Sequence, residues 1–93
     1  MADREITRLV RLSPEDNVAV AVSAIQAGET VMLEGRPVTA VEPIPAGHKI
    51  ALTAIQARQK VLKYGLPIGS ATCDIAAGRH VHTHNLVSDY LPE

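Results

Sequence analysis

Short apolar runs separated by glycine- and proline-containing turns make up most of the chain. Alternation of apolar positions and β-branched residues favours strands over helices. Two of these runs flank Glu34-Gly35 and predict a hairpin. Six prolines and six glycines spread along the chain argue against any long helix. The sequence therefore predicts an all-β fold, with strands at residues 17–22, 30–33, 37–41, 49–52 and 79–83.

A turn pattern, Ile-x-Ala-Gly-x-x-Val/Ile, repeats along the chain. Copies begin at Ile25, Ile44 and Ile75, and a fourth copy at Ile55 has Arg58 where the others have glycine. Ile is expected to anchor each turn in the core, while Ala-Gly lets the backbone reverse. Because the copies are unevenly spaced, the pattern predicts a fold of many corners and not a solenoid.

The organisation expected is one domain over residues 1–93, with a core from about residue 6 to about 86 and a C-terminal tail at 87–93. No linker, low-complexity stretch or charge block divides it. The tail is expected to fray or to serve as an interface arm. Ser13 and Pro14 are typical of an N-cap and a first helical position, which predicts one helical turn at 13–16.

Composition and charge narrow the class of protein. Hydrophobic residues form 46% of the chain, without Trp or Phe, so aliphatic side chains must fill the core. Nine basic against ten acidic residues give a net charge of −1, and the basic residues are scattered, which argues against a nucleic-acid partner.

Several features predict a cytoplasmic protein. Cys73 is the only cysteine, which suits a reducing compartment, and a buried, inert thiol is expected there. Residues 1–11 are charged and lack the apolar core of a signal peptide. No apolar run approaches the ~18 to 20 residues of a membrane span, so no membrane partner is expected.

Three of the four histidines, His80, His82 and His84, occupy alternate positions. In a strand such residues share one face, and neutral imidazole is a common ligand for Zn, Fe or Mn. Because residues two apart in a strand are ~6.5 to 7 Å apart, one ion is expected to take at most two of them. The alternative interpretation is a set of polar side chains on a solvated strand face.

Other candidates stand in two further segments. His48 and Lys49 occupy the repeat position that Arg79 and His80 occupy in the last copy. If the repeats are related in space, these basic side chains gather near one pocket and suit a carboxylate. Tyr64 lies in a turn-rich segment at 63–69 and is a candidate acid or hydrogen-bond donor. For each, an ordinary surface or packing role is the alternative.

Taken in order, four segments resemble a known family: Asp-Asn-Val-Ala-Val-Ala at 16–21, Gly-His-Lys-Ile-Ala-Leu at 47–52, Lys-Tyr-Gly-Leu-Pro-Ile-Gly at 63–69, and 74–85 with its three histidines. They are similar to the N-terminal SAF domain of altronate and galactarate dehydratases. Sulfolactate sulfo-lyase, whose corresponding domain is a separate small subunit, is similar too. The resemblance implies a β-clip fold.

The resemblance also implies an activity. Members dehydrate a sugar acid, altronate giving 2-keto-3-deoxygluconate, with Fe(II) or a similar divalent metal such as Mn or Zn. Sulfo-lyases eliminate sulfite instead. The chemistry implied is proton abstraction beside a carboxylate with acid assistance to the leaving group. A large catalytic subunit or domain is the partner implied, without which this chain should be inactive. Exposed sheet edges make self-association a further expectation.

The resemblance implies roles for individual residues as hypotheses. The set is His48, His82 and Tyr64 as catalytic, Lys49, Arg79 and Asn85 as substrate-binding, and His80, His82 and His84 as metal ligands. A non-catalytic binding or assembly module is the second hypothesis, because a fold does not fix a function.

Overall fold

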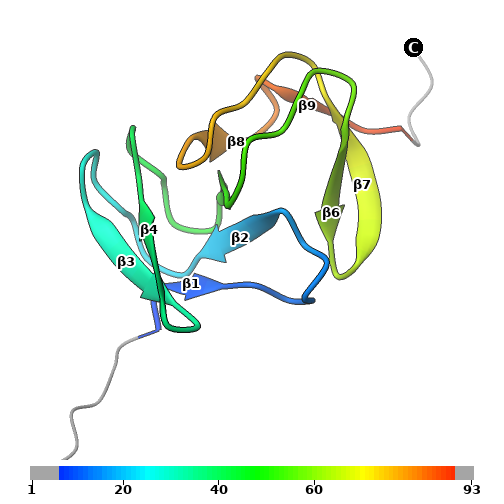
Figure 1. The fold of residues 1–93 in the computed structure, drawn as a ribbon. Helices are drawn as coiled ribbons and strands as arrows, with labels where there is room; N and C mark the ends of the chain where they lie inside the picture. Colours follow the sequence, from blue (N-terminus) through cyan, green and yellow to red (C-terminus); the bar gives the residue numbers. More distant parts are fainter. Residues whose placement is uncertain (1–6, 90–93) are drawn as a thin grey trace, which may run out of the picture.

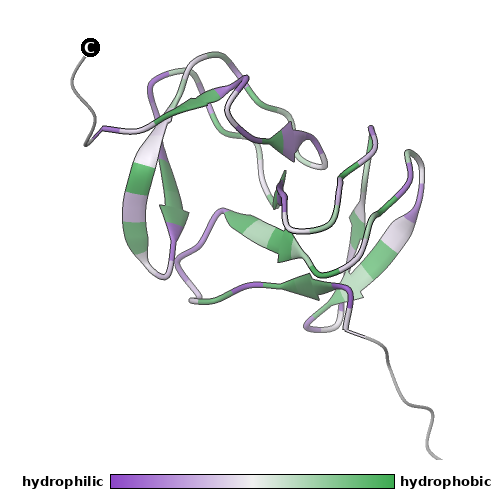
Figure 2. Cartoon of the chain, turned by 180° about the vertical axis from the view of Figure 1, so that it is seen from behind, coloured by the Kyte–Doolittle hydropathy of each residue, from purple (hydrophilic) through white to green (hydrophobic). Residues whose placement is uncertain are grey.

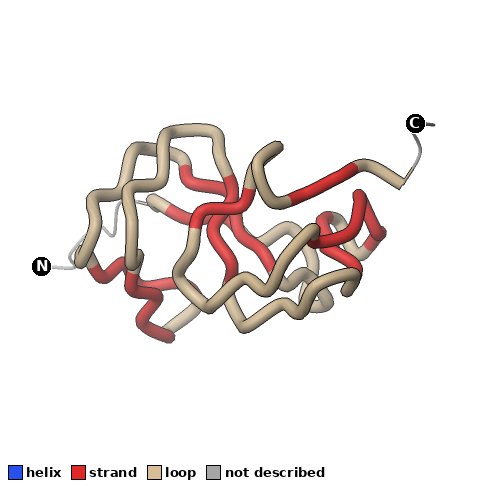
Figure 3. The backbone as a smooth tube through the Cα atoms, turned by 90° about the horizontal axis from the view of Figure 1, so that it is seen from above, coloured by secondary structure: helices blue, strands red, loops and turns tan. Residues whose placement is uncertain are grey.

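The computed structural model describes residues 7–89, which form short antiparallel strands joined by turns and contain no helix (Figure 3). The all-β, SAF-like class expected from the sequence is confirmed. The strands form three sheets, in the orders β1-β2-β5-β8, β3-β4 and β6-β7-β9. They are β1 (Leu9–Val10), β2 (Val18–Ala21), β3 (Thr30–Leu33), β4 (Arg36–Thr39), β5 (Lys49–Ala51), β6 (Lys60–Lys63), β7 (Leu66–Ala71), β8 (His80–Val81) and β9 (Leu86–Val87).

The predicted hairpin is present. Strands β3 and β4 pair around Glu34 and Gly35, which both have positive φ, as a tight two-residue hairpin turn requires. The strands expected at 17–22, 37–41 and 49–52 correspond to β2, β4 and β5 with ends that differ by one or two residues. The strand expected at 79–83 is shorter, because β8 ends at Val81 and the chain turns immediately after it.

The helical turn predicted at 13–16 is wrong. The amide of Asp16 donates to the carbonyl of Ser13 at 3.0 Å, and the amide of Ser13 donates to the Asp16 carboxylate at 3.1 Å. The side chain of Asp16 therefore closes an isolated turn, because it offers the backbone a local partner other than a helical carbonyl.

Strands β1, β6, β7 and β9 were not expected. Beyond the turn at Tyr64 and Gly65, the segment predicted to be turn-rich continues as β7. Strand β9 pairs with β7 through Val87 and Ser70, so paired structure extends one residue into the segment expected as a tail. Residues 90–93, like Ile6, lie outside the described residues.

Two units of the fold have the same backbone design (Figure 1). In each, an Ile-containing turn leads into a hairpin and then into a second Ile-containing turn. An isolated β-bridge joins the two turns, Ile25 to Ile44 in the first unit and Ile55 to Ile75 in the second. The hairpins are β3–β4 and β6–β7, which stand on opposite sides of β2 in Figure 1. The repeated turn pattern thus marks an internal duplication.

Hydrogen bonds at the turns repeat in the same way. The amide of Gly28 donates to Ala40 at 2.7 Å, and the amide of Arg58 donates to Ala71 at 2.7 Å. Arg58 has φ of 73°, close to the 84° of Gly28. The turn geometry is therefore kept where the glycine is missing, and Arg58 adopts a left-handed conformation that L residues rarely take.

The two units have separate hydrophobic cores on opposite sides of the β2–β5 pair. Adjacent residues of one strand point to different cores, Val18 to the second and Ala19 to the first, as strand alternation requires. The first core contains Leu9, Ala19, Ala21, Ile25, Val31, Ala40, Ile44 and Ile50. The second contains Val18, Ala51, Ile55, Val61, Ala71, Ile75 and Val81.

Asp16 connects the N-terminal segment to the second hairpin. Its carboxylate, 5% exposed, also accepts hydrogen bonds from the amides of Tyr64 at 3.0 Å and Gly65 at 2.7 Å. With the bond from Ser13, three backbone donors converge on one buried acid. Such a charge is tolerated in the interior because the amides replace its water shell.

Candidate functional site

Histidines just before β5 and along and just after β8 meet at the edge of the central sheet. Lys49 on β5 lies opposite Val81 on β8 in antiparallel register. Continuing that register by one residue sets His48 opposite His82, with both side chains on the same face. Because β8 is the edge strand of the sheet, this pair stands at its border. Figure 2 shows β1 and β2 as largely hydrophobic strands, whereas β8 combines the polar His80 with the buried Val81.

The rings of His48, His80 and His82 form a compact stack. The centroids of His48 and His82 are 3.9 Å apart with planes at 16°, and those of His48 and His80 are 4.9 Å apart with planes at 22°. Nδ1 of His48 and Nε2 of His80 are 2.7 Å apart and share a hydrogen bond. A protonated ring has no acceptor nitrogen, so at least one of the two must be neutral.

These three side chains offer a candidate metal site. One ring nitrogen from each lies within 4.8 Å of the other two, and all three residues are partly buried. Three neutral nitrogen donors suit divalent iron or zinc. The group therefore includes His48 beside two of the three histidines predicted as ligands.

His84 lies beside this group without joining it. Its ring centroid is 5.0 Å from that of His80, with planes tilted by 35°, and its side chain is exposed. The alternation that predicted a shared face required the strand to continue. Because the chain turns at residues 82–85, His84 is placed by a turn and not by a strand.

The surroundings favour neutral imidazoles. Burial lowers the pKa of His80, and the neighbouring histidines, His84 first, lower it further. Burial also lowers the pKa of His82, followed by the charges of His48 and Lys49. A lowered pKa means that these rings lose their protons more readily than free histidine, so they are available as ligands near neutral pH.

Asn85 fixes the loop that carries the histidines. Its side chain is 7% exposed and bonds to the backbone at both ends: Oδ1 accepts from the amide of His82 at 3.0 Å, and Nδ2 donates to the carbonyl of His80 at 2.8 Å. Its carbonyl accepts the amide of Thr72 at 3.0 Å. The structure thus gives Asn85, expected to bind substrate, a positioning role.

Glu42 is a residue that the sequence analysis missed. Its carboxylate accepts the amide of His80 at 3.0 Å and pairs with Arg79 at 3.8 Å. Arg79 was expected to bind a substrate carboxylate. In the structure its guanidinium already pairs with the carboxylate of Glu42. No local sequence pattern points to Glu42, because it reaches β8 from the loop after β4.

The remaining predicted residues lie in different surroundings. Lys49 is half-buried, and burial followed by the charge of Lys63 lowers its pKa. Tyr64 is 64% exposed at the tip of the β6–β7 hairpin, outside the histidine group. Cys73 is exposed, so the prediction of a buried thiol is wrong.

The fold and this group define a small all-β domain that presents clustered histidines at the border of its central sheet. The chain belongs to the altronate/galactarate dehydratase SAF domain family, whose model matches residues 7–89. The family resemblance found in the sequence is confirmed.

Similar proteins include enzymes and enzyme subunits. The chain is 47% identical over 76 residues to altronate dehydratase of Escherichia coli and 41% identical over 76 residues to that of Bacillus subtilis. These matches cover 82% of this chain but 15% of each dehydratase, so the chain spans a small part of those relatives. It is also 34% identical over 73 residues to (2R)-sulfolactate sulfo-lyase subunit alpha of Chromohalobacter salexigens, covering 72% of this chain and 78% of that subunit.

No helix in the described part of the chain could cross a membrane.

Proposed function

We propose that this chain is the SAF component of a cytoplasmic carbon–oxygen lyase that dehydrates a sugar acid of the altronate type. It acts with a large catalytic subunit or domain. The observation that carries the proposal is the convergence of His48, His80 and His82 at a sheet border in a domain of the dehydratase family. A histidine group at the border is accessible to a partner that supplies the rest of an active site.

The second candidate is the small subunit of a sulfolactate sulfo-lyase. It is favoured by the similarity to subunit alpha, which the chain covers over most of its length. Both reactions are eliminations beside a carboxylate, so the same residues serve either leaving group. A binding or assembly module remains the third candidate, and the histidine group argues against it because assembly alone needs no convergent imidazoles.

The metal proposed is Fe(II), with Mn or Zn as alternatives, held by His48, His80 and His82. The donor set fits, since the lowered pKa values of His80 and His82 favour neutral rings and one ring nitrogen from each of the three residues lies within 4.8 Å of the other two. A bound divalent ion would supply Lewis acidity toward the substrate's carboxylate or hydroxyl oxygens. Asn85 and Glu42 hold the backbone that carries two of the ligands.

The other residues near the group have proposed roles in substrate handling. Lys49 is the cation proposed to attract the carboxylate, because no carboxylate of the described residues pairs with it. His84, exposed beside His80, is proposed to exchange a proton with the substrate. Tyr64 lies away from the histidines, at the tip of the β6–β7 hairpin. It is therefore proposed to contribute to catalysis only where that tip contacts the large subunit.

The proposal is tested by reconstitution. The chain is mixed with a large subunit or domain of the family under anaerobic conditions with Fe(II), and altronate, galactarate and sulfolactate are offered in turn. We expect keto acid to form from a sugar acid only when both components are present. Sulfite from sulfolactate would support the second candidate, and a stable complex without turnover on any of the three acids would support the assembly module.

Metal binding by the chain alone gives a separate prediction. His82→Ala removes a ligand, so we expect its Zn²⁺ affinity to fall by more than the roughly 10- to 100-fold that loss of an outer partner costs. His84→Ala is the matched control, two residues along the chain. It should retain most of the Zn²⁺ affinity because His84 lies outside the three-residue group. Isothermal titration calorimetry measures both. Equal losses in the two variants would contradict this ligand set.

A further inference from the structure

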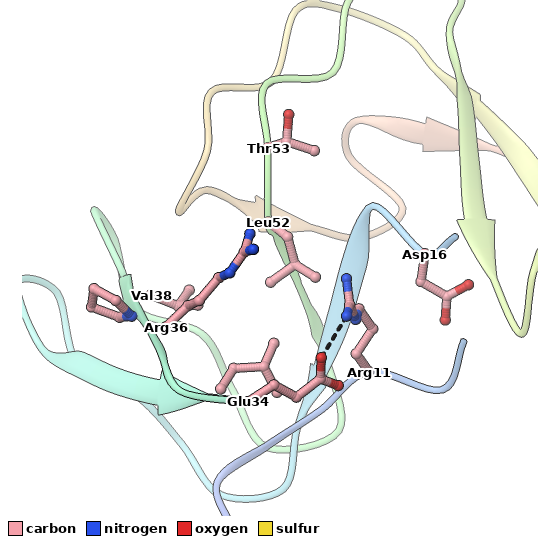
Figure 4. Close-up of a pocket in the computed structure, with 9 residues that line it drawn as sticks. Arg11, Asp16, Glu34, Arg36, Val38, Leu52 and Thr53 are labelled. Atoms are coloured by element: carbon pink, nitrogen blue, oxygen red, sulfur yellow. Dashed lines mark hydrogen bonds and ion pairs between the residues drawn. The ribbon is translucent and has the colours of Figure 1, made fainter. Parts of the chain in front are cut away.

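We propose that a second site, away from the histidines, binds a small carboxylate with a short aliphatic chain. The site is a pocket of about 480 Å³ between the first hairpin, the end of β5 and the N-terminal segment (Figure 4). This volume lies within the roughly 300–1,000 Å³ of small-molecule sites. The lining residues are Arg11, Asp16, Leu33, Glu34, Arg36, Pro37, Val38, Leu52 and Thr53.

An unsatisfied donor lies in the wall of this pocket. Nε of Arg11 is buried and has no hydrogen-bond partner, and within residues 7–89 no other buried side-chain nitrogen or oxygen is in that state. Its Nη2 is paired with Glu34 at 2.5 Å. A buried N–H without an acceptor costs free energy, so its presence beside a cavity indicates a place for an acceptor that enters from outside.

A second guanidinium reaches the same space. Arg36 extends from β4 toward Leu52, while Arg11 lies across the pocket beside Glu34 (Figure 4). In the described part of the chain, no acid pairs with the Arg36 guanidinium. A carboxylate has two oxygens and matches the fork of an arginine, so an anion in this space can pair with Arg36. Its second oxygen can accept from Arg11 once the Arg11 side chain turns its buried Nε toward the pocket.

The charges in the pocket favour a monoanion. Glu34 compensates Arg11, and the carboxylate of Asp16 is occupied by three backbone amides. The positive charge of Arg36 is left without a counter-ion. The four charged side chains of the lining sum to zero formal charge, so a ligand with a single negative charge pairs with Arg36 and adds one net negative charge, whereas a dianion would add a second one beside the two acids.

The apolar part of the lining indicates what the uncharged part of the ligand is. Leu33, Val38 and Leu52 are partly buried and pack against the first core, so their exposed sides form a fixed wall. A short hydrocarbon chain removes this wall from water. The ligand class is therefore a short-chain monocarboxylic acid, and the site is independent of the lyase proposal.

The test is a titration of the ¹⁵N-labelled full chain with valerate, followed by amide chemical shifts at constant ionic strength. Saturable shifts are expected at Leu52, Thr53 and Glu34, and not at His82. 1-Pentanol, which lacks the charge, and acetate, which lacks the chain, should each bind more weakly. Inorganic phosphate binding as tightly as valerate would overturn the ligand class.

Substitutions at Arg36 and Arg11 measure separately how much each guanidinium contributes to valerate binding. Arg36→Gln should weaken valerate binding roughly tenfold or more, because it removes a charge-assisted pair. Arg11→Lys keeps the positive charge but removes Nε–H, and should weaken binding as well. Arg58→Gln, an arginine outside the pocket lining, is the control and should bind like the parent chain. The proposal is overturned if valerate causes no saturable shifts at Leu52 and Thr53, or if Arg36→Gln binds valerate unchanged while its unfolding midpoint equals that of the control.

Discussion

Replacing Gly78 with alanine is expected to lower the free energy of unfolding by about 2–5 kcal/mol. A Cβ at this position would lie 2.3 Å from the carbonyl oxygen of Thr39, and φ is +87°. Overpacking costs about 1–3 kcal/mol, and the left-handed conformation adds about 1–2 kcal/mol for a residue with a side chain. Domains are stable by only about 5–15 kcal/mol, so this loss is severe.

Gly28→Ala is the matched control for Gly78→Ala. Gly28 has nearly the same φ, +84°, but a Cβ there would meet nothing within 4 Å. It should therefore lose only the conformational part, about 1–2 kcal/mol. Urea unfolding followed by far-ultraviolet circular dichroism measures both variants. If Gly78→Ala is no less stable than Gly28→Ala, the close approach of Gly78 to Thr39 is not tight in solution.

Removing the carboxylate of Asp16 is the second large effect expected. Asp16→Ala leaves the amides of Ser13, Tyr64 and Gly65 without their acceptor in a region where the acid itself was only 5% exposed. These three hydrogen bonds are part-buried, and a hydrogen bond to a charged group contributes about 1.5–3 kcal/mol, so a loss of at least about 3 kcal/mol is expected. Asp16→Asn, which keeps one oxygen, should lose less.

Asp74→Ala provides the comparison for Asp16→Ala. Asp74 also accepts a backbone amide, from Ala57 at 2.8 Å, but it is exposed, so water can replace it. Its removal should cost below about 1 kcal/mol. Urea unfolding gives the free energies, and hydrogen exchange at the Tyr64 and Gly65 amides should accelerate in the Asp16 variant alone. Equal stability of Asp16→Ala and Asp74→Ala would contradict the role given to Asp16.

Turn chemistry made much of the fold predictable. The Glu34-Gly35 hairpin followed from local signals, and the repeated turns were visible as Ile-x-Ala-Gly. The second hairpin was missed because Pro67 and Gly69 usually interrupt strands. In the structure Pro67 pairs opposite Leu62, where the register shifts. Gly69 is required where a Cβ would come within 2.3 Å of the Val87 carbonyl.

The candidate site was predicted in part. His80 and His82 could be singled out by spacing, and the equivalence of the repeats hinted that the turn with His48 would join them. The place of His84 could not be foreseen, because Asn85 turns the chain through bonds to the backbone of His80 and His82. Spacing alone gives no information on where a strand ends.

The duplication has a consequence for how the chain folds. The β2–β5 pair is the common wall of both cores, since Ile50 packs into the first and Ala51 into the second. If one half unfolds, it exposes one face of β2 and β5, and the opposite face of the same strands forms part of the other half's core. The domain should therefore unfold as one cooperative transition, and a polypeptide cut between the two units should yield no independently stable half, however alike the halves are in design.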